Sequence, residues 1–120
     1  MKLAANLAVA LVALLPLYFL VLEMFLWDKP FGRRSFRLTP EFAAASRSLA
    51  ANQGLYNGFL AAGLLWGLWL GEGGNSIELF FLACVVVAGV FGAATVNRKI
   101  LLVQALPGAI ALLLVWVSAR

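Results

Sequence analysis

Residues 3–27 read LAANLAVALVALLPLYFLVLEMFLW, and this stretch decides the fold class because it holds a single charged side chain, Glu23. At 1.5 Å per residue, a helix of this length exceeds the hydrocarbon core of a bilayer, which is about 30 Å thick. A cleaved signal peptide is the competing interpretation. The run is longer than the apolar part of such a peptide, and Asp28-Lys29-Pro30 follows where small residues would be needed. We therefore predict a membrane-spanning helix.

Three more apolar runs follow, at about residues 49–70, 77–96 and 100–118. Hydrophobic residues make up 64% of the 120-residue chain and charged residues only 12%, so the long runs lack the polar face of a helix that borders water. We predict an all-α membrane protein in which a bundle of four transmembrane helices forms a single domain over residues 1–120.

The longest connection, about residues 28–48, contains the start of a helix. Thr39 supplies a hydroxyl N-cap, Pro40 fits the first helical position, and the Glu41 carboxylate is favourable at the positive end of the helix dipole. We expect this helix to run directly into the second span. The other two breaks are a turn-forming cluster at residues 71–76 and a charged corner at residues 97–99.

Basic residues are divided unequally between the two sides of the predicted bundle. Short cytoplasmic loops are enriched in Lys and Arg, so the side with more cations is predicted to be cytoplasmic and both termini to lie outside. The cytoplasmic set is Lys29, Arg33, Arg34, Arg37, Arg47, Arg98 and Lys99, and the other set is Lys2 and Arg120.

Three of these cations, Arg33, Arg34 and Arg37, lie among aromatic residues just after the first span. Aromatic rings at headgroup depth, beside cations that favour anionic lipid, commonly anchor a protein at the membrane interface, and we prefer that interpretation. A dedicated site for a lipid headgroup or phosphate, made by the same three arginines, is the alternative.

Small residues recur at the four-residue spacing that lets transmembrane helices approach closely. In the second run, Gly63 and Gly67 point nearly opposite to a first face of small residues, so this helix should pack between neighbours on both sides. A homo-oligomer through the glycine faces is the alternative to packing within one chain. The first face is Ala51, Gly54, Gly58, Ala61 and Ala62; the third run offers Cys84, Ala88, Gly92 and Thr95; the fourth offers Gln104, Gly108, Ala111, Val115 and Ser118.

Polar side chains inside a bilayer need an explanation, since a central carboxylate costs about 3 kcal/mol on insertion scales. In the predicted orientation they gather at the cytoplasmic ends of the spans, and we predict a polar pocket open to the cytoplasmic leaflet. The alternative is that Glu23 pairs with Arg98 or Lys99 while the amides hold the helices together. The candidate ligand-binding residues are Glu23, Asn52, Gln53, Tyr56, Asn57, Thr95, Asn97, Arg98 and Gln104.

The remaining polar chemistry is sparse. Glu72 and Glu78 are expected to be ordinary solvated residues at the other surface. The chain has no histidine and one cysteine, Cys84, which excludes the common zinc and haem ligand sets and an intrachain disulfide. We therefore expect no metal, no cofactor and no nucleic-acid partner.

Five motifs are spread along the chain. They are Leu22-Glu23-Met24-Phe25-Leu26-Trp27, Leu38-Thr39-Pro40-Glu41-Phe42, Ala50-Ala51-Asn52-Gln53-Gly54-Leu55-Tyr56-Asn57-Gly58-Phe59-Leu60-Ala61, Gly92-Ala93-Ala94-Thr95 and Leu101-Leu102-Val103-Gln104-Ala105-Leu106-Pro107. With these motifs the chain resembles, over essentially its whole length, the small bacterial membrane proteins known as domain of unknown function 1304. The resemblance implies a four-helix architecture in the bacterial inner (plasma) membrane and no established activity.

Three classes of function are open, and we favour a protein that binds or transports a small amphipathic or lipid-like molecule. A small multidrug transporter with dual topology is disfavoured by the unequal cations. A structural subunit that packs against a membrane partner is the second class. A membrane-embedded enzyme that uses Glu23 is the third and weakest, because acid and base roles normally need two suitable groups. No catalytic residue is assigned.

Overall fold

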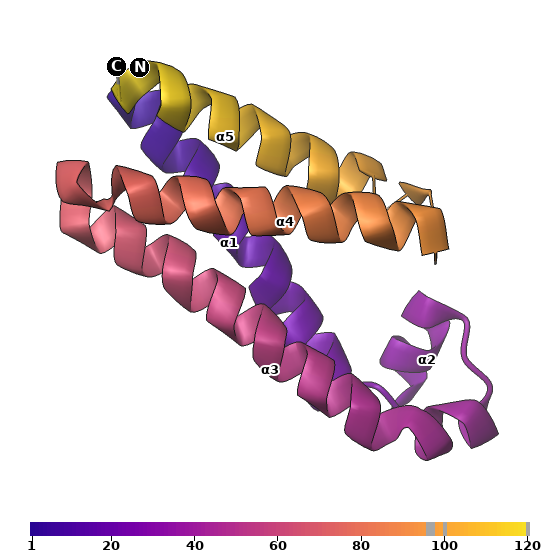
Figure 1. Cartoon of the computed structure of the whole chain (residues 1–120). Helices are drawn as coiled ribbons and strands as arrows, with labels where there is room; N and C mark the ends of the chain where they lie inside the picture. The colour runs from indigo at the N-terminus through magenta and orange to yellow at the C-terminus, as the bar shows by residue number, and fades with distance from the viewer. Residues whose placement is uncertain (96–97, 100, 120) are drawn as a thin grey trace. The chain divides into compact units, whose positions relative to one another are not determined.

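The computed structural model describes residues 1–95, 98–99 and 101–119, and these residues form helices and no strand. The prediction of an all-helical chain is confirmed for this part. The long helices are α1 (Lys2–Met24), α3 (Pro40–Leu70), α4 (Asn75–Thr95) and α5 (Leu106–Ala119) (Figure 1). The shorter segments are α2 (Pro30–Phe36), the 3-10 turn η1 (Gly71–Gly74) and the π-helical η2 (Leu101–Ala105).

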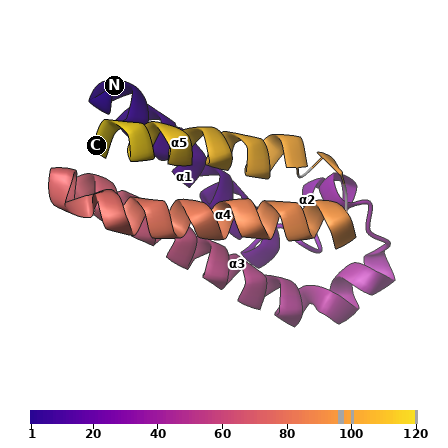
Figure 2. The same cartoon turned by 45° about the horizontal axis from the view of Figure 1, so that its top comes forward.

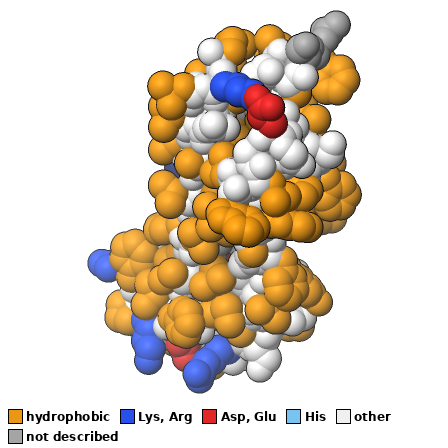
Figure 3. Space-filling model, turned by 90° about the vertical axis from the view of Figure 1, so that its left-hand side faces the viewer, with side chains coloured by type: hydrophobic (Ala, Val, Ile, Leu, Met, Phe, Trp, Pro, Cys, Tyr) orange, Lys and Arg blue, Asp and Glu red, His pale blue; other side chains and the backbone are white. Residues whose placement is uncertain are grey.

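Three helical stretches of the described residues are long and apolar enough to cross a membrane: Lys2–Met24, Pro40–Thr95 and Leu101–Ala119. The second stretch is 56 residues long because it contains α3 and α4 on either side of η1. Large hydrophobic side chains are widely exposed, up to 82% at Trp69, and hydrophobic side chains cover most of the face in Figure 3. Such a surface is suited to hydrocarbon.

The chain forms two compact units, which are described one at a time. Unit 1 consists of Met1–Leu15 and Leu60–Arg120, and unit 2 consists of Pro16–Phe59. Helices α1 and α3 each contribute to both units, because the first division falls inside α1 and the second inside α3.

In unit 1, α4 and α5 lie side by side (Figures 1 and 2). Two glycines allow close contact here. A Cβ added to Gly89 of α4 would lie 2.8 Å from the Ala105 nitrogen of η2, and one at Gly108 of α5 would lie 3.1 Å from Val85 Cγ1 of α4. The start of α1 and the end of α5 lie together at one end of this unit (Figures 1 and 2). The core of unit 1 includes the fully buried side chains of Val9, Leu64, Leu82, Val85 and Val115.

The packing face predicted for the fourth run is confirmed at Gly108, Ala111 and Val115, which are all buried. The face predicted for the third run is wrong. Ala88 and Thr95 are exposed, while the buried side of α4 is formed by Glu78, Leu82, Val85 and Gly89. The close approach on α4 is made by Gly89, one residue beyond the predicted Ala88, and by Val85 and Val86, which lie against Gly108 of α5.

Glycines of α3 make close contacts within each unit. In unit 1, Gly63 faces the ring of Phe81 and a Cβ at Gly67 would lie 2.5 Å from Glu78 Cγ. In unit 2, a Cβ at Gly54 would lie 2.5 Å from Met24 Cγ, and one at Gly58 would lie 2.8 Å from a methyl carbon of Leu20. The glycines of α3 therefore admit α4 in unit 1 and the end of α1 in unit 2. Ala62, predicted for the same face as Gly54 and Gly58, is exposed instead.

Local sequence accounts for the ends of α3. At its start, the Phe42 nitrogen donates a 3.1 Å hydrogen bond to Thr39 Oγ1, which confirms the N-cap. The helix then continues without interruption to Leu70. At its end, Gly71 adopts a φ of 65°, a left-handed conformation that glycine takes without steric cost, and η1 leads into α4.

Candidate functional site

Glu23 lies near the end of α1 and makes the central polar contact of unit 2. Asn57 Nδ2, on α3, donates a hydrogen bond of 2.6 Å to Glu23 Oε1. Both residues are half-buried. The bond joins α1 to α3, and through it an amide of α3 faces the carboxylate of α1.

Glycine places Asn57 at this position. A Cβ at Gly54 would lie 3.2 Å from both Glu23 Cβ and the Leu20 carbonyl oxygen, so the two backbones are nearly in contact there. Asn57 follows Gly54 by three residues, and residues at that spacing share a helix face. The face that brings the helices together is therefore also the face that presents the amide to Glu23.

The other polar residues of α3 do not join this contact. Asn52, Gln53 and Tyr56 are exposed, and the Tyr56 ring lies 6.1 Å from the ring of Phe59 between centroids. Of the band predicted around this helix, the structure brings Asn57 alone to Glu23.

The remaining candidates belong to unit 1. Gln104 Nε2 donates to the Val85 carbonyl oxygen at 3.2 Å, so this amide links η2 to α4. The Thr95 hydroxyl donates to the Phe91 carbonyl oxygen of its own helix at 2.7 Å, and Arg98 is exposed. Asn97 lies outside the described residues. Gln104 thus matches the alternative interpretation, in which amides hold helices together, and the predicted site as a whole stays a prediction.

The connection in unit 2 is folded against α3 by specific contacts. The Trp27 indole nitrogen donates to Ser46 Oγ at 2.9 Å, and its ring lies 4.9 Å from that of Phe36. Arg47 forms a 3.7 Å ion pair with Asp28. These contacts fix α2 beside the start of α3.

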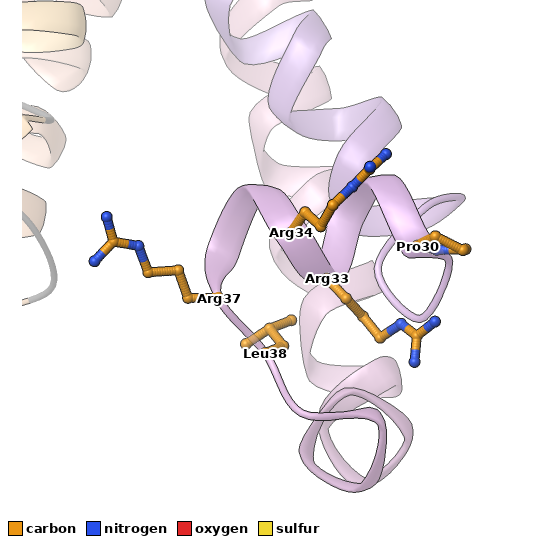
Figure 4. A pocket seen from close by; sticks show the side chains of 5 residues that line it. All are labelled: Pro30, Arg33, Arg34, Arg37 and Leu38. Atoms are coloured by element: carbon orange, nitrogen blue, oxygen red, sulfur yellow. The ribbon is translucent and has the colours of Figure 1, made fainter.

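Arg33, Arg34 and Arg37 border an open cavity of about 460 Å³ together with Pro30 and Leu38. Helix α2 ends beside this cavity. Arg37 adopts a left-handed conformation with a φ of 56°, and the Leu38 backbone nitrogen donates a 2.8 Å hydrogen bond to the Arg33 carbonyl oxygen. Figure 4 shows the three guanidinium groups pointing in different directions. This arrangement presents a broad positive surface and does not enclose one anion.

Glu78 corrects an expectation from the sequence. It was expected to be solvated, but it is only 2% exposed, although it lies in the first turn of α4. Gly67 makes the space, since its missing side chain leaves room for Glu78 Cγ. The sequence contains a signal for this burial, since Glu78 is a carboxylate within an apolar run and lies opposite a glycine of the preceding helix.

Within the described residues, no group of three or more His, Cys, Asp or Glu side chains gathers that could hold a metal ion.

Comparison with known proteins adds the family. The family described as Protein of unknown function (DUF1304) matches residues 10–116, which contain Glu23, Asn57 and Glu78. The chain belongs to this family. It is also similar to "Uncharacterized protein YpaA" of Lactococcus lactis subsp. lactis (strain IL1403), with 31% identity over 96 residues that cover 78% of this chain and 81% of the relative. No solved structure matches it.

Proposed function

We propose that this member of the DUF1304 family is a multi-pass protein of the bacterial inner membrane that binds a small amphipathic molecule at Glu23. The chain crosses the membrane four times, both termini lie outside, and Glu23 lies in the cytoplasmic leaflet. The unequal distribution of basic residues supports this orientation. The apolar helices support the membrane location.

The observation that carries the proposal is the hydrogen bond from Asn57 to Glu23. A carboxylate in a membrane-spanning helix is costly and is usually retained for a function. An ionised carboxylate can accept about four hydrogen bonds, and Asn57 Nδ2 supplies one. A ligand with a cationic headgroup would supply further donors and an opposite charge, and so would stabilise Glu23 more than the amide does.

Apolar side chains on the face of α1 that carries Glu23 would accept the apolar part of the ligand. Leu20 and Phe19 lie three and four residues before Glu23, a spacing that places them on the same face, and both are half-buried. A cationic headgroup with a single hydrocarbon chain therefore fits the chemistry of the site.

Binding of dodecylamine tests the proposal, with dodecanol as the uncharged probe of the same chain length. We expect isothermal titration in detergent micelles to show saturable binding of dodecylamine and weaker binding of dodecanol. Glu23→Gln should lower the affinity for dodecylamine by about ten-fold or more, because one charge-assisted hydrogen bond contributes about 1.5–3 kcal/mol.

Glu41→Gln is the matched control, since Glu41 is an exposed carboxylate at the start of α3. It should leave the affinity unchanged. Equal affinities for wild type and Glu23→Gln, with both proteins folded, would show that Glu23 does not select the ligand.

A further inference from the structure

A second polar feature lies in unit 1, at the end where α1 begins and α5 ends. It is a cavity of about 220 Å³. Residues from α1, η1, α4 and α5 form its wall, so the cavity depends on the folded arrangement of all these elements. Its polar lining residues are Lys2, Asn6, Glu72, Asn75, Glu78 and Ser118.

Glu78 is the unusual member of this lining. Its side chain borders the cavity, yet the residue is only 2% exposed. In the part of the chain that the structure describes, the carboxylate has neither a hydrogen-bond partner nor an ion-pair partner. An isolated buried carboxylate is costly unless a charge or a set of donors compensates it.

The other charged groups of the cavity are already matched. The Lys2 ammonium group forms an ion pair with Glu72, and both side chains reach solvent. One negative charge, that of Glu78, is left over. The cavity therefore has the charge to hold one monovalent cation.

The size and donor set of the cavity favour an organic ammonium group over a bare metal ion. At about 30 Å³ per water molecule, the volume corresponds to roughly seven waters, far more than one ion fills. A primary ammonium has three N–H donors, and carboxylate, amide and hydroxyl oxygens of Glu78, Asn75 and Ser118 border the space.

We propose that this cavity binds a primary ammonium group and that Glu78 is its counter-charge. The cavity lies at the ends of apolar, span-length helices, which is the depth of lipid headgroups. The ammonium can therefore come from an ethanolamine lipid headgroup or from a free small amine. This inference does not rest on the function proposed for Glu23, which lies in unit 2.

Thermal unfolding in the presence of ethanolamine tests the site, with choline and sodium chloride at equal ionic strength as comparisons. Choline carries the same charge but has no N–H donor. We expect ethanolamine to raise the unfolding temperature of wild type in a saturable manner and choline to have little effect. Equal effects of ethanolamine, choline and sodium would exclude a site for free amines, and would overturn the proposal if phosphatidylethanolamine also fails to protect the protein.

The source of the ammonium is distinguished by nanodiscs of phosphatidylethanolamine and phosphatidylcholine. Protection by the ethanolamine lipid without protection by free ethanolamine identifies a lipid headgroup. Protection by both identifies a site that free amines also enter. If neither protects the protein, the site does not bind a primary ammonium.

Variants then assign the effect to Glu78. Glu78→Gln should lose the protection, with an apparent affinity about ten-fold weaker or worse, since a buried charge pair is removed. Glu41→Gln, far along the sequence at an exposed position, should keep it. Lys2→Gln removes the side-chain ammonium group that pairs with Glu72, and so should strengthen the binding of ethanolamine. Weaker binding of ethanolamine by Lys2→Gln would contradict the assignment. Unchanged binding by Glu78→Gln would contradict it as well.

Discussion

Asn57 Nδ2 donates a 2.6 Å hydrogen bond to Glu23 Oε1, and this bond connects α3 to α1 at the point where Gly54 lets their backbones meet. Packing and polar chemistry are therefore coupled in unit 2. Asn57 follows Gly54 by three residues on the same helix face, so the close contact at Gly54 also directs the Asn57 amide at Glu23.

Asn57→Ala should destabilise the protein by about 1 to 2 kcal/mol, because it removes a donor from a half-buried carboxylate. Thermal unfolding in detergent measures the effect. Asn52→Ala is the control, since Asn52 is an exposed asparagine of the same helix, and it should change the stability by about 0.5 kcal/mol or less.

A double-mutant cycle separates this bond from other effects of the substitution. Asn57→Ala combined with Glu23→Ala should show a coupling free energy of about 0.5 kcal/mol or more, as residues in direct contact do. Additive losses would mean that the hydrogen bond contributes nothing to stability.

Two adjacent glycines of η1 should respond in opposite ways to alanine. A Cβ at Gly74 would collide with the backbone carbonyl of Gly67, whereas a Cβ at Gly73 meets nothing within 4 Å. Gly74→Ala should cost about 3 kcal/mol, because neither backbone can move without opening the connection between α3 and α4. Gly73→Ala should stay within about 0.5 kcal/mol of wild type. Similar unfolding temperatures for the two variants would contradict the close contact of Gly67 and Gly74.

The three arginines in and directly after α2 should act independently on anionic lipid. Because the guanidinium groups of Arg33, Arg34 and Arg37 diverge (Figure 4), each Arg→Gln variant should weaken association by a similar amount, about 1 kcal/mol at low salt. The losses should add within about 0.5 kcal/mol and shrink as salt is raised. Native mass spectrometry of retained phosphatidylglycerol measures this.

Arg47→Gln serves as the control, because Arg47 pairs with Asp28 and its charge is offset. One variant that abolishes lipid retention while the other two have no effect would indicate a dedicated headgroup site in place of a broad positive surface.

The sequence predicted the helices and the close contacts at the glycines of α3 well, because hydrophobic runs, the Thr39 cap and glycine spacing act locally. The sequence did not predict which residues are buried where burial depends on a neighbouring helix. Gly89 on α4 is buried and Ala88 is exposed, although both are small, because Gly89 is the residue that contacts Ala105 of η2.

The polar residues show the same limit. The number of polar residues in this apolar chain predicts that some of them contact one another, and Asn57 does donate a hydrogen bond to Glu23. Which amide contacts Glu23 depends on how α1 and α3 are aligned along their lengths. The spacing of residues within one helix does not predict that alignment. For Glu78 the sequence does carry a signal, a carboxylate within an apolar run, and its burial follows from the space that Gly67 of the preceding helix leaves.

The central claim is a chain that crosses the inner membrane with its arginine-rich, Glu23-containing end in the cytoplasm. Labelling of single cysteines by a membrane-impermeant maleimide, in right-side-out spheroplasts of a Cys84→Ala background, tests it directly. Ser76→Cys, next to the turn between α3 and α4, should be labelled in intact spheroplasts, and Ser35→Cys, on α2, only after permeabilisation. The reverse pattern, or equal labelling of both positions in intact spheroplasts, would contradict the account.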